Sequence, residues 1–249
     1  MEEFRIDPTI SYDVVELPSR GIHYPSGKKS LRIAYLTASD ENILSSANLL
    51  ASNKMLEELL KRKVLDKDFN TDELCEEDKQ AILIFLRNTA FGTIYKYTTI
   101  DPKTEKEFSV DIDLSELKYK DFTLVADSNG EYPYHMEKSK VNITFKFLTS
   151  KQEKELKDIE TSWNGNGVAP IITKKLEMMI KSVEGNKDLM NTHNFVDRLP
   201  IKDSQDFRKF VEENKPGVNL TQTINTPSGD ITQIEIGFGV GFFRPFYGL

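Results

Sequence analysis

Two stretches of the sequence present the same order of patterns, and this repetition limits the architectures that the chain can adopt. LRIAYLTASDENIL (31–44) aligns with ITFKFLTSKQEKEL (143–156), so that Leu36-Thr37 matches Leu148-Thr149. Each stretch follows a Tyr-Pro turn and leads through two helical patterns to a hairpin pattern. A repeated order of this kind favours an internal duplication. The alternative is coincidence among short β patterns.

Alternating apolar residues predict the strands. Ser30–Leu36 and Val141–Leu148 each place apolar side chains on one face, which is typical of a half-buried strand. The segments Tyr95–Ile112 and Leu220–Ile236 alternate on both sides of the breakers DPKT and NTPSG. Breakers between two alternating runs predict a β-hairpin in each half.

Apolar residues at helical spacing predict the helices, and hydroxyl residues mark where some of them begin. Thr37, Thr71 and Thr149 each precede an acidic or polar first turn, where a hydroxyl oxygen accepts hydrogen bonds from free backbone N–H groups. The predicted helices cover residues 49–65, 71–88, 150–160, 171–183 and 203–214.

Together these patterns predict an α+β fold made of two related halves, each with a strand, a helical pair and a β-hairpin. The length of 249 residues exceeds the usual domain of ~100–150 residues and has room for both halves. We expect an N-terminal α+β unit over residues 1–118. A C-terminal α+β unit with an aromatic tail is expected over residues 119–249.

Composition excludes several classes of protein. Hydrophobic residues make up 38% of the chain, which is enough for a packed core. A formal net charge of −7 gives no surplus positive field for phosphates, so we expect no nucleic acid and no anionic membrane as partners. No stretch approaches the ~18–20 apolar residues that cross a bilayer, and the start MEEFRIDPTI lacks the features of a signal peptide. The chain is expected to be soluble and intracellular where it is made.

The candidates for catalysis lie in one acidic run. Glu76, Glu77 and Asp78 offer paired carboxylates for acid–base chemistry, but their place at the start of a predicted helix favours a solvated first turn. Cys75 is the single cysteine, and its acidic neighbours raise the pKa of a thiol, so a structural role is expected. We predict no catalytic residues and no enzyme activity.

Metal and cofactor sites are not expected either. One cysteine cannot form a multi-cysteine zinc or iron–sulfur site, and His23, His135 and His193 lack the short spacing of a metal motif. The NGNG and GFGVG segments lack the strand, helix and lysine of a phosphate-binding loop. The sequence therefore predicts no metal and no cofactor.

The chain ends in an apolar, glycine-rich segment, GFGVGFFRPFYGL. Its aromatic residues are Phe238, Phe242, Phe243, Phe246 and Tyr247. These five are predicted as a partner-binding site, because exposed aromatic clusters mark protein interfaces. The alternative is that they complete the core of the second half.

The order of the motifs resembles a family of phage proteins. LPSRGIHYPSG, the strand ending in LTASDENIL, LLASNKMLEELLKRKVLD and DKQAILIFLRNTAFG follow one another and lead to a hairpin. In this combination they are similar to the baseplate hub and hub-assembly (chaperone) proteins of T-even-like contractile-tailed bacteriophages. The resemblance is strongest over Leu17–Leu117 and continues through the C-terminal hairpin and the FFRP ending.

The resemblance implies a non-enzymatic role, either as a hub component of the tail baseplate or as a chaperone of hub assembly. The implied partners are other baseplate hub or tape-measure proteins. The implied locations are the cytoplasm of the infected bacterial host during assembly and the virion tail baseplate. One rival is a permanent virion part without chaperone action, and another is a tail-carried hydrolase of the cell envelope. The oligomeric state stays open.

The resemblance also implies, in many relatives, a Cys-Pro-x-Cys-Gly knuckle in each hairpin turn that would bind zinc. The matching segments here are DPKTE (Asp101–Glu105) and NTPSG (Asn225–Gly229), which keep prolines and turn residues but hold no thiolate. Zinc is therefore not expected. Turn propensity and cross-strand pairs are expected to hold the hairpins instead.

Overall fold

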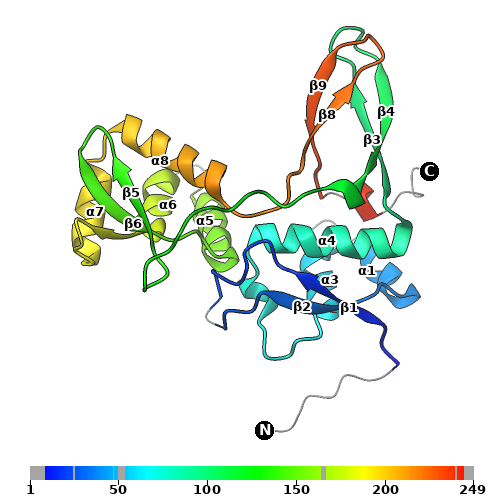
Figure 1. The fold of residues 1–249 in the computed structure, drawn as a ribbon, viewed down its shortest axis with the longest axis horizontal. Coiled ribbons are helices and arrows are strands. Elements are labelled where there is room, and N and C mark those ends of the chain that lie inside the picture. The colour runs from blue at the N-terminus through cyan, green and yellow to red at the C-terminus, as the bar shows by residue number, and fades with distance from the viewer. Residues whose placement is uncertain are drawn as a thin grey trace.

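The computed structural model describes residues 9–24, 26–46, 48–49, 54–163, 167–238 and 240–243. Figure 1 shows two lobes and a projecting pair of hairpins. We call the described residues of 9–91 the first lobe and those of 132–214 the second lobe; residues 94–113 and 221–235 together are the hairpin arm. Helices combine with small antiparallel sheets, so the α+β prediction is confirmed.

The first lobe packs helices on a two-stranded antiparallel sheet. Its long helix buries Ile82 and Leu86 completely and ends before Gly92, whose positive φ of 82° suits glycine. In chain order its elements are β1 (Tyr12–Glu16), β2 (Ser30–Ala34), η1 (Ala38–Asp40), α1 (Glu41–Leu44), α3 (Met55–Lys63), η2 (Thr71–Glu73) and α4 (Glu76–Phe91).

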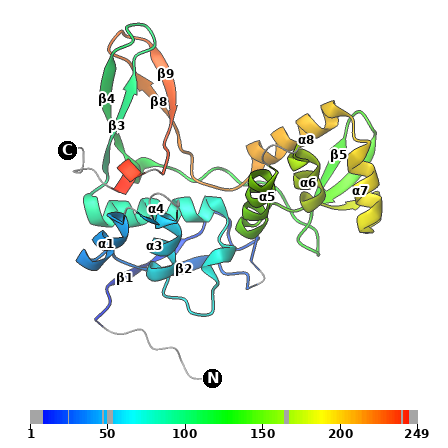
Figure 2. The ribbon, with the colours of Figure 1, turned by 180° about the vertical axis from the view of Figure 1, so that it is seen from behind.

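The hairpin arm is built from two segments that lie far apart in the sequence. Each segment forms an antiparallel hairpin, and the two hairpins lie side by side in both views (Figures 1 and 2). Both hairpin predictions are confirmed. The strands are β3 (Ile94–Ile100), β4 (Glu107–Asp113), β8 (Thr221–Asn225) and β9 (Ile231–Glu235), with the short helices η3 (Leu114–Glu116) and η4 (Val240–Phe243) at the base.

The second lobe packs helices against a three-stranded antiparallel sheet of order β5-β6-β7. Phe207 is fully buried, and its ring lies 5.2 Å from that of Phe145 on the central strand. The elements are β5 (Tyr132–Met136), β6 (Val141–Phe145), α5 (Ser150–Ser162), α6 (Ile171–Met179), β7 (Ile180–Val183), α7 (Leu189–Asp197) and α8 (Ile201–Asn214).

Buried side chains form two separate cores. One core joins residues between 15 and 114 with residues between 218 and 243, and the other lies between residues 132 and 207. The second hairpin therefore contributes Ile224 and Ile234 to the core of the first lobe. The prediction of two related halves is not confirmed, and the division into 1–118 and 119–249 stays a prediction.

Two antiparallel connecting segments carry the chain out to the second lobe and back. The Lys120 amide donates to the Gly217 carbonyl at 2.7 Å, and the Asn219 amide donates to the Lys118 carbonyl at 2.8 Å. Because the outgoing and returning segments pair with each other, the chain leaves the second lobe where it entered. This pairing delivers the second hairpin beside the first.

Several element boundaries differ from the sequence predictions. Thr71 begins a short 3-10 helix, and α4 starts only at Glu76, with Cys75 in the N-cap position. The helix predicted over 171–183 ends at Met179, because Ile180–Val183 pairs with β6 as a third strand. The predicted turn at Tyr132-Pro133 is wrong, because both residues pair with β6 as the start of strand β5. Strand β1 and helix α7 have no counterpart in the predictions.

Other predictions of local structure are confirmed. Thr149 caps α5: the Gln152 amide donates to the Thr149 hydroxyl at 3.4 Å, and the Thr149 amide donates to the Gln152 side chain at 3.0 Å. These reciprocal bonds satisfy donors that the first helical turn leaves free. The helix predicted over 203–214 corresponds to α8.

Candidate functional site

The C-terminal aromatic residues lie at the base of the hairpin arm. Phe242 and Phe243 are each 1% exposed and join the core of the first lobe, while Phe238 is half-buried against it. The Phe242 ring lies 4.9 Å from that of Phe238 and 5.3 Å from that of Tyr95 on β3. The aromatic cluster thus fixes η4 between α4 and the arm.

Arg87 of α4 lies beneath this cluster and is 1% exposed. Its guanidinium donates to the carbonyl of Gly92 and, at 2.9 Å, to that of Ile94. It also stacks 5.3 Å from the centroid of Tyr95 and 5.7 Å from that of Phe242. Burial lowers the pKa of Arg87, since the charged form loses water. Arg87 therefore ties α4, the start of β3 and η4 together.

Of the predicted partner-binding residues, the structure thus brings Phe238, Phe242 and Phe243 together. Phe246 and Tyr247 lie outside the described residues. Since Phe242 and Phe243 are buried, they support the surface at the base of the arm from within. Partner binding by the five aromatic residues stays a prediction.

The acidic run occupies the first turn of α4, but its three carboxylates have different surroundings. Asp78 is fully buried and accepts hydrogen bonds from the Ser19 amide at 2.9 Å, the Ser19 hydroxyl and the Tyr24 hydroxyl. The expectation of a solvated turn is therefore wrong for Asp78. Glu77 pairs with Lys215 at 3.3 Å, whereas Glu76 is exposed. Asp78 ties the turn-rich segment before β2 to the start of α4.

Cys75 belongs to the same buried cluster. Its thiol is 1% exposed and lies 3.4 Å from the Tyr24 hydroxyl. Burial, followed by the charges of Asp78 and Glu77, raises the pKa of the Cys75 thiol strongly. Since the thiolate is the nucleophilic form, this environment suits a structural cysteine.

The turns of the two hairpins meet at the tip of the arm. Asp101 is 1% exposed, and its carboxylate accepts hydrogen bonds from the Lys103 amide at 2.9 Å and, across the hairpins, from Ser228. The Ser228 amide lies 3.1 Å and its hydroxyl 3.0 Å from the carboxylate oxygens. Thr226 is 5% exposed and exchanges two hydrogen bonds of 3.1 Å with the backbone of Asp230.

These tip residues do not fit the zinc ion that the family resemblance implies. A cation needs free acceptor lone pairs, and zinc favours thiolate and imidazole ligands. Here the Asp101 carboxylate already faces N–H and O–H donors, and the neighbouring groups are a serine and a threonine hydroxyl. Within the described part of the chain, no group of three or more His, Cys, Asp and Glu side chains is arranged to hold a metal ion.

A groove runs along α4 between β1 and the start of the outgoing connecting segment. Its volume is about 310 Å³. The floor is a helical stripe of α4, Ala81, Ile84, Phe85 and Asn88, and Val14 stands on one wall with 60% of its surface exposed. The side-chain oxygen of Asn88 is buried and has no hydrogen-bond partner among the described residues.

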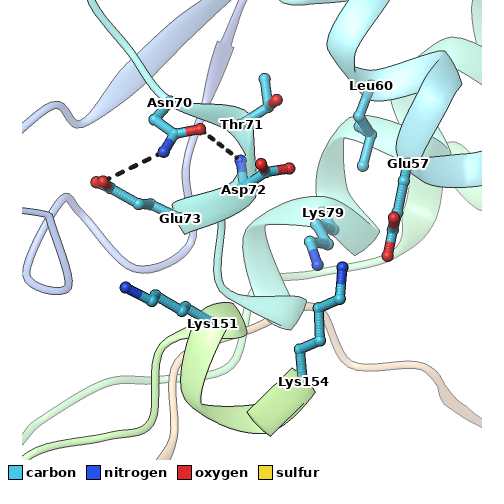
Figure 3. Close-up of a pocket in the computed structure, with 9 residues that line it drawn as sticks. All are labelled: Glu57, Leu60, Asn70, Thr71, Asp72, Glu73, Lys79, Lys151 and Lys154. Atoms are coloured by element: carbon cyan, nitrogen blue, oxygen red, sulfur yellow. Dashed lines mark hydrogen bonds between the residues drawn. The ribbon is translucent and has the colours of Figure 1, made fainter. Parts of the chain in front are cut away.

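A second cleft, of about 360 Å³, lies between the lobes. Figure 3 shows Lys79 and Lys154 directed toward Glu57 across it, with Lys151 nearby on α5. Lysines of the second lobe thus face carboxylates of the first. This arrangement suits electrostatic attraction between the lobes, and it places no cysteine or histidine beside the carboxylates.

Neither the α4 groove nor the Asp101–Ser228 contact is predicted from the sequence. The contact could have been predicted, because the alignment of the two halves matches the turns DPKTE and NTPSG, and equivalent turns can lie side by side. The groove could not have been, since its walls come together only through the tertiary fold.

Comparison with known proteins gives the family. A family model described as T4 bacteriophage base plate protein matches residues 19–243, which is most of the chain. No curated protein and no solved structure matches. Among the described residues, no helix is long and apolar enough to cross a membrane. The match spans both lobes and the arm, so the chain belongs to the T4 bacteriophage base plate protein family.

Proposed function

We propose that this protein acts without catalysis, by binding other proteins during assembly of the baseplate hub, as a hub component or as a hub-assembly chaperone. Its partners would be other hub proteins or tape-measure proteins. It would act in the cytoplasm of the infected bacterium, and as a hub component it would stay in the virion baseplate. Membership of a baseplate family supports this role.

The observation that carries the proposal is the groove on α4. Leu17 and Lys29 form a hydrogen-bonded pair, as do Ser11 and Tyr35. Because such pairs alternate along an antiparallel ladder, Tyr12, Val14 and Glu16 direct their backbone groups away from β2.

The outer edge of β1 therefore presents backbone donors and acceptors beside an apolar floor. Among the described residues, β1 pairs only with β2, and at the end of the edge the Tyr119 hydroxyl donates to the Glu16 carbonyl at 2.9 Å. An open edge next to apolar pockets accepts an added strand from a partner. The buried Asn88 oxygen would accept a hydrogen bond from that partner.

The carboxylates at the start of α4 support a role without catalysis. Asp78 is engaged by Ser19 and Tyr24, and Glu77 by Lys215. These intramolecular contacts hold loops and connecting segments in place, which is a structural role. The aromatic segment at the base of the arm, with half-buried Phe238, is proposed as a further contact for the partner.

A Val14→Pro variant tests whether the groove is the binding surface. The variant is used to capture co-expressed hub proteins of the same phage. Proline removes the outward N–H of Val14 and leaves the β1–β2 hydrogen bonds intact, so the fold is expected to persist. Captured hub protein, measured by quantitative mass spectrometry, should fall at least about tenfold. Val14→Thr keeps the N–H and should bind normally. Equal capture by both variants, with equal thermal unfolding, would contradict the groove as the binding surface.

Quantitative mass spectrometry of purified particles separates the two roles. A hub component is expected in fixed stoichiometry with other baseplate proteins. A chaperone is expected in infected cells but scarce in finished particles. Absence from both particles and hub-assembly intermediates would contradict the proposed function.

A further inference from the structure

The hairpin arm needs stabilising contacts beyond its own strand pairing, because each of its sheets has only two strands. An isolated two-stranded hairpin is marginally stable in water. At the base, the hairpins share the core of the first lobe through Ile112 and Ile234. The core continues along the arm as far as Phe108 and Ile224, but it includes no residue of the turns 101–106 and 226–230, so the turns must be held in another way.

The contacts at the tip link residues 127 positions apart in the sequence. Both oxygens of the Asp101 carboxylate accept hydrogen bonds from Ser228, one from its hydroxyl at 3.0 Å and the other from its amide at 3.1 Å. The same carboxylate accepts from the amides of Lys103 and Thr104 in its own turn, at 2.9 and 3.4 Å. One buried carboxylate thus accepts hydrogen bonds both from its own turn and from the turn of the other hairpin.

We infer that Asp101 and Ser228 form a metal-free joint that locks the tips of the two hairpins into a single rigid arm. The joint occupies the turns in which the family resemblance implies a zinc knuckle in many relatives but not in this chain. A charged acceptor surrounded by donors makes stronger hydrogen bonds than neutral groups do. The same donors repel a cation, so the joint and a metal ion are alternatives at this place.

Asp101 has two roles that one substitution can separate. An asparagine keeps one carbonyl oxygen, which still accepts from the Lys103 amide, and asparagine is favoured in such turns. The same oxygen also accepts from the Ser228 hydroxyl, but the NH₂ group that replaces the other oxygen cannot accept from the Ser228 amide. Asp101→Asn is therefore expected to preserve the local turn and to weaken the cross-hairpin joint.

Hydrogen–deuterium exchange on the purified full chain tests the inference. Asp101→Asn should raise exchange about tenfold in both turns, at residues 101–106 and 226–230, without change at the base of the arm. Ser228→Ala should raise it in both turns as well, and the double variant should add little to either single variant. Asp111→Asn, an exposed residue of the same hairpin, is the matched control.

Two further measurements on the unmodified protein complete the test. Exchange at the tips should be the same with EDTA as with zinc chloride, and metal analysis should find no stoichiometric zinc. Faster exchange in the Asp101 turn alone would overturn the joint between hairpins. One zinc per chain, or loosening of the tips by EDTA, would overturn its independence of metal.

Discussion

The two ends of the hairpin arm are stabilised by different kinds of interaction, apolar packing at the base and hydrogen bonds at the tip. At the base, buried Phe242 and Arg87 pack against half-buried Tyr95 in an aromatic cluster. At the tip, Asp101 and Ser228 meet through directed hydrogen bonds. Apolar burial yields a large free energy that depends little on geometry, whereas a hydrogen bond yields less and depends strongly on it. The base is therefore expected to hold the arm in place and the tip to set its shape.

The contrast also separates what each end contributes to the whole protein. The base joins the arm to α4, the long helix of the first lobe, so damage there spreads into the core. The contacts at the tip join only the two turns to each other. We expect variants at the base to change the free energy of global unfolding and variants at the tip to change local opening.

Phe242→Ala is the strongest test of the base. The side chain is 1% exposed and contacts the rings of Tyr95, Phe238 and Phe243, so its removal leaves a cavity. We expect a loss of about 3–5 kcal/mol in the free energy of unfolding, measured by urea denaturation. Phe238→Ala, at a half-buried site, should cost about 1–2 kcal/mol. Equal losses would show that η4 does not seal the core.

Arg87→Met tests the polar part of the base. Methionine keeps an apolar stem but removes the donors to the Gly92 and Ile94 carbonyls and the cation above the Tyr95 ring. We expect a loss of about 1–3 kcal/mol in urea denaturation. Lys96→Met, on the exposed face of β3, is the control and should change stability by less than about 0.5 kcal/mol. An unchanged Arg87→Met protein would mean that packing alone holds the base.

Thr226→Val tests the tip without touching Asp101. The hydroxyl exchanges two hydrogen bonds with the Asp230 backbone and shares a third, of 2.9 Å, with the Ser228 hydroxyl, and valine has the same shape without them. We expect a loss of about 1 kcal/mol, seen as faster amide exchange at Asp230. Thr223→Val, at an exposed position of β8, should leave exchange unchanged. A loss as large as that of Phe242→Ala would refute the division between base and tip.

The arm shows what could be predicted from the sequence and what could not. Alternation around DPKT and NTPSG predicted both hairpins, because turn residues and a two-residue period are local signals. The return of the second hairpin to the core of the first lobe was not predicted. It depends on the pairing of the connecting segments at Tyr119 and Val218, which no local pattern records.

The candidate site shows the same limit. The five aromatic residues were recognised as a unit, but whether they face solvent or core depends on where α4 and β3 lie. Asp78 illustrates the point at a single residue: an acidic side chain in a first helical turn is usually solvated, but here Ser19 and Tyr24 cover it. Likewise, Ile180–Val183 continues the helical pattern of the preceding residues in the sequence, but in the structure these residues pair with β6 as a strand.

Acid titration gives the smallest effect and compares the two ends directly. Burial alone would raise the pKa of Asp101, but hydrogen bonds from Lys103 and Ser228 lower it below the ordinary 3.8. A carboxyl with a lowered pKa in the folded state stabilises the fold above its ordinary pKa, and this contribution is lost as the pH falls through the lowered value. Lys103 and Asp230, 4.0 Å apart, are charged neighbours in the same turns.

The amide chemical shift of Ser228, followed by NMR from pH 7 to pH 2, is the measurement. We expect a transition with a midpoint below 3.8 in the unmodified protein and its disappearance in Asp101→Asn. At the base, the amide of Phe242 should not change over this range, because the Arg87 guanidinium beside its ring stays charged from pH 2 to pH 7. Amides beside Asp113 are left out of the comparison, since hydrogen bonds also lower the pKa of that carboxyl and it titrates in the same range. A midpoint at or above the ordinary value would mean that the donors at the tip do not favour the ionised carboxylate. Parallel changes at base and tip would mean that the whole arm responds to acid as one unit, because the joint would then be coupled to the core.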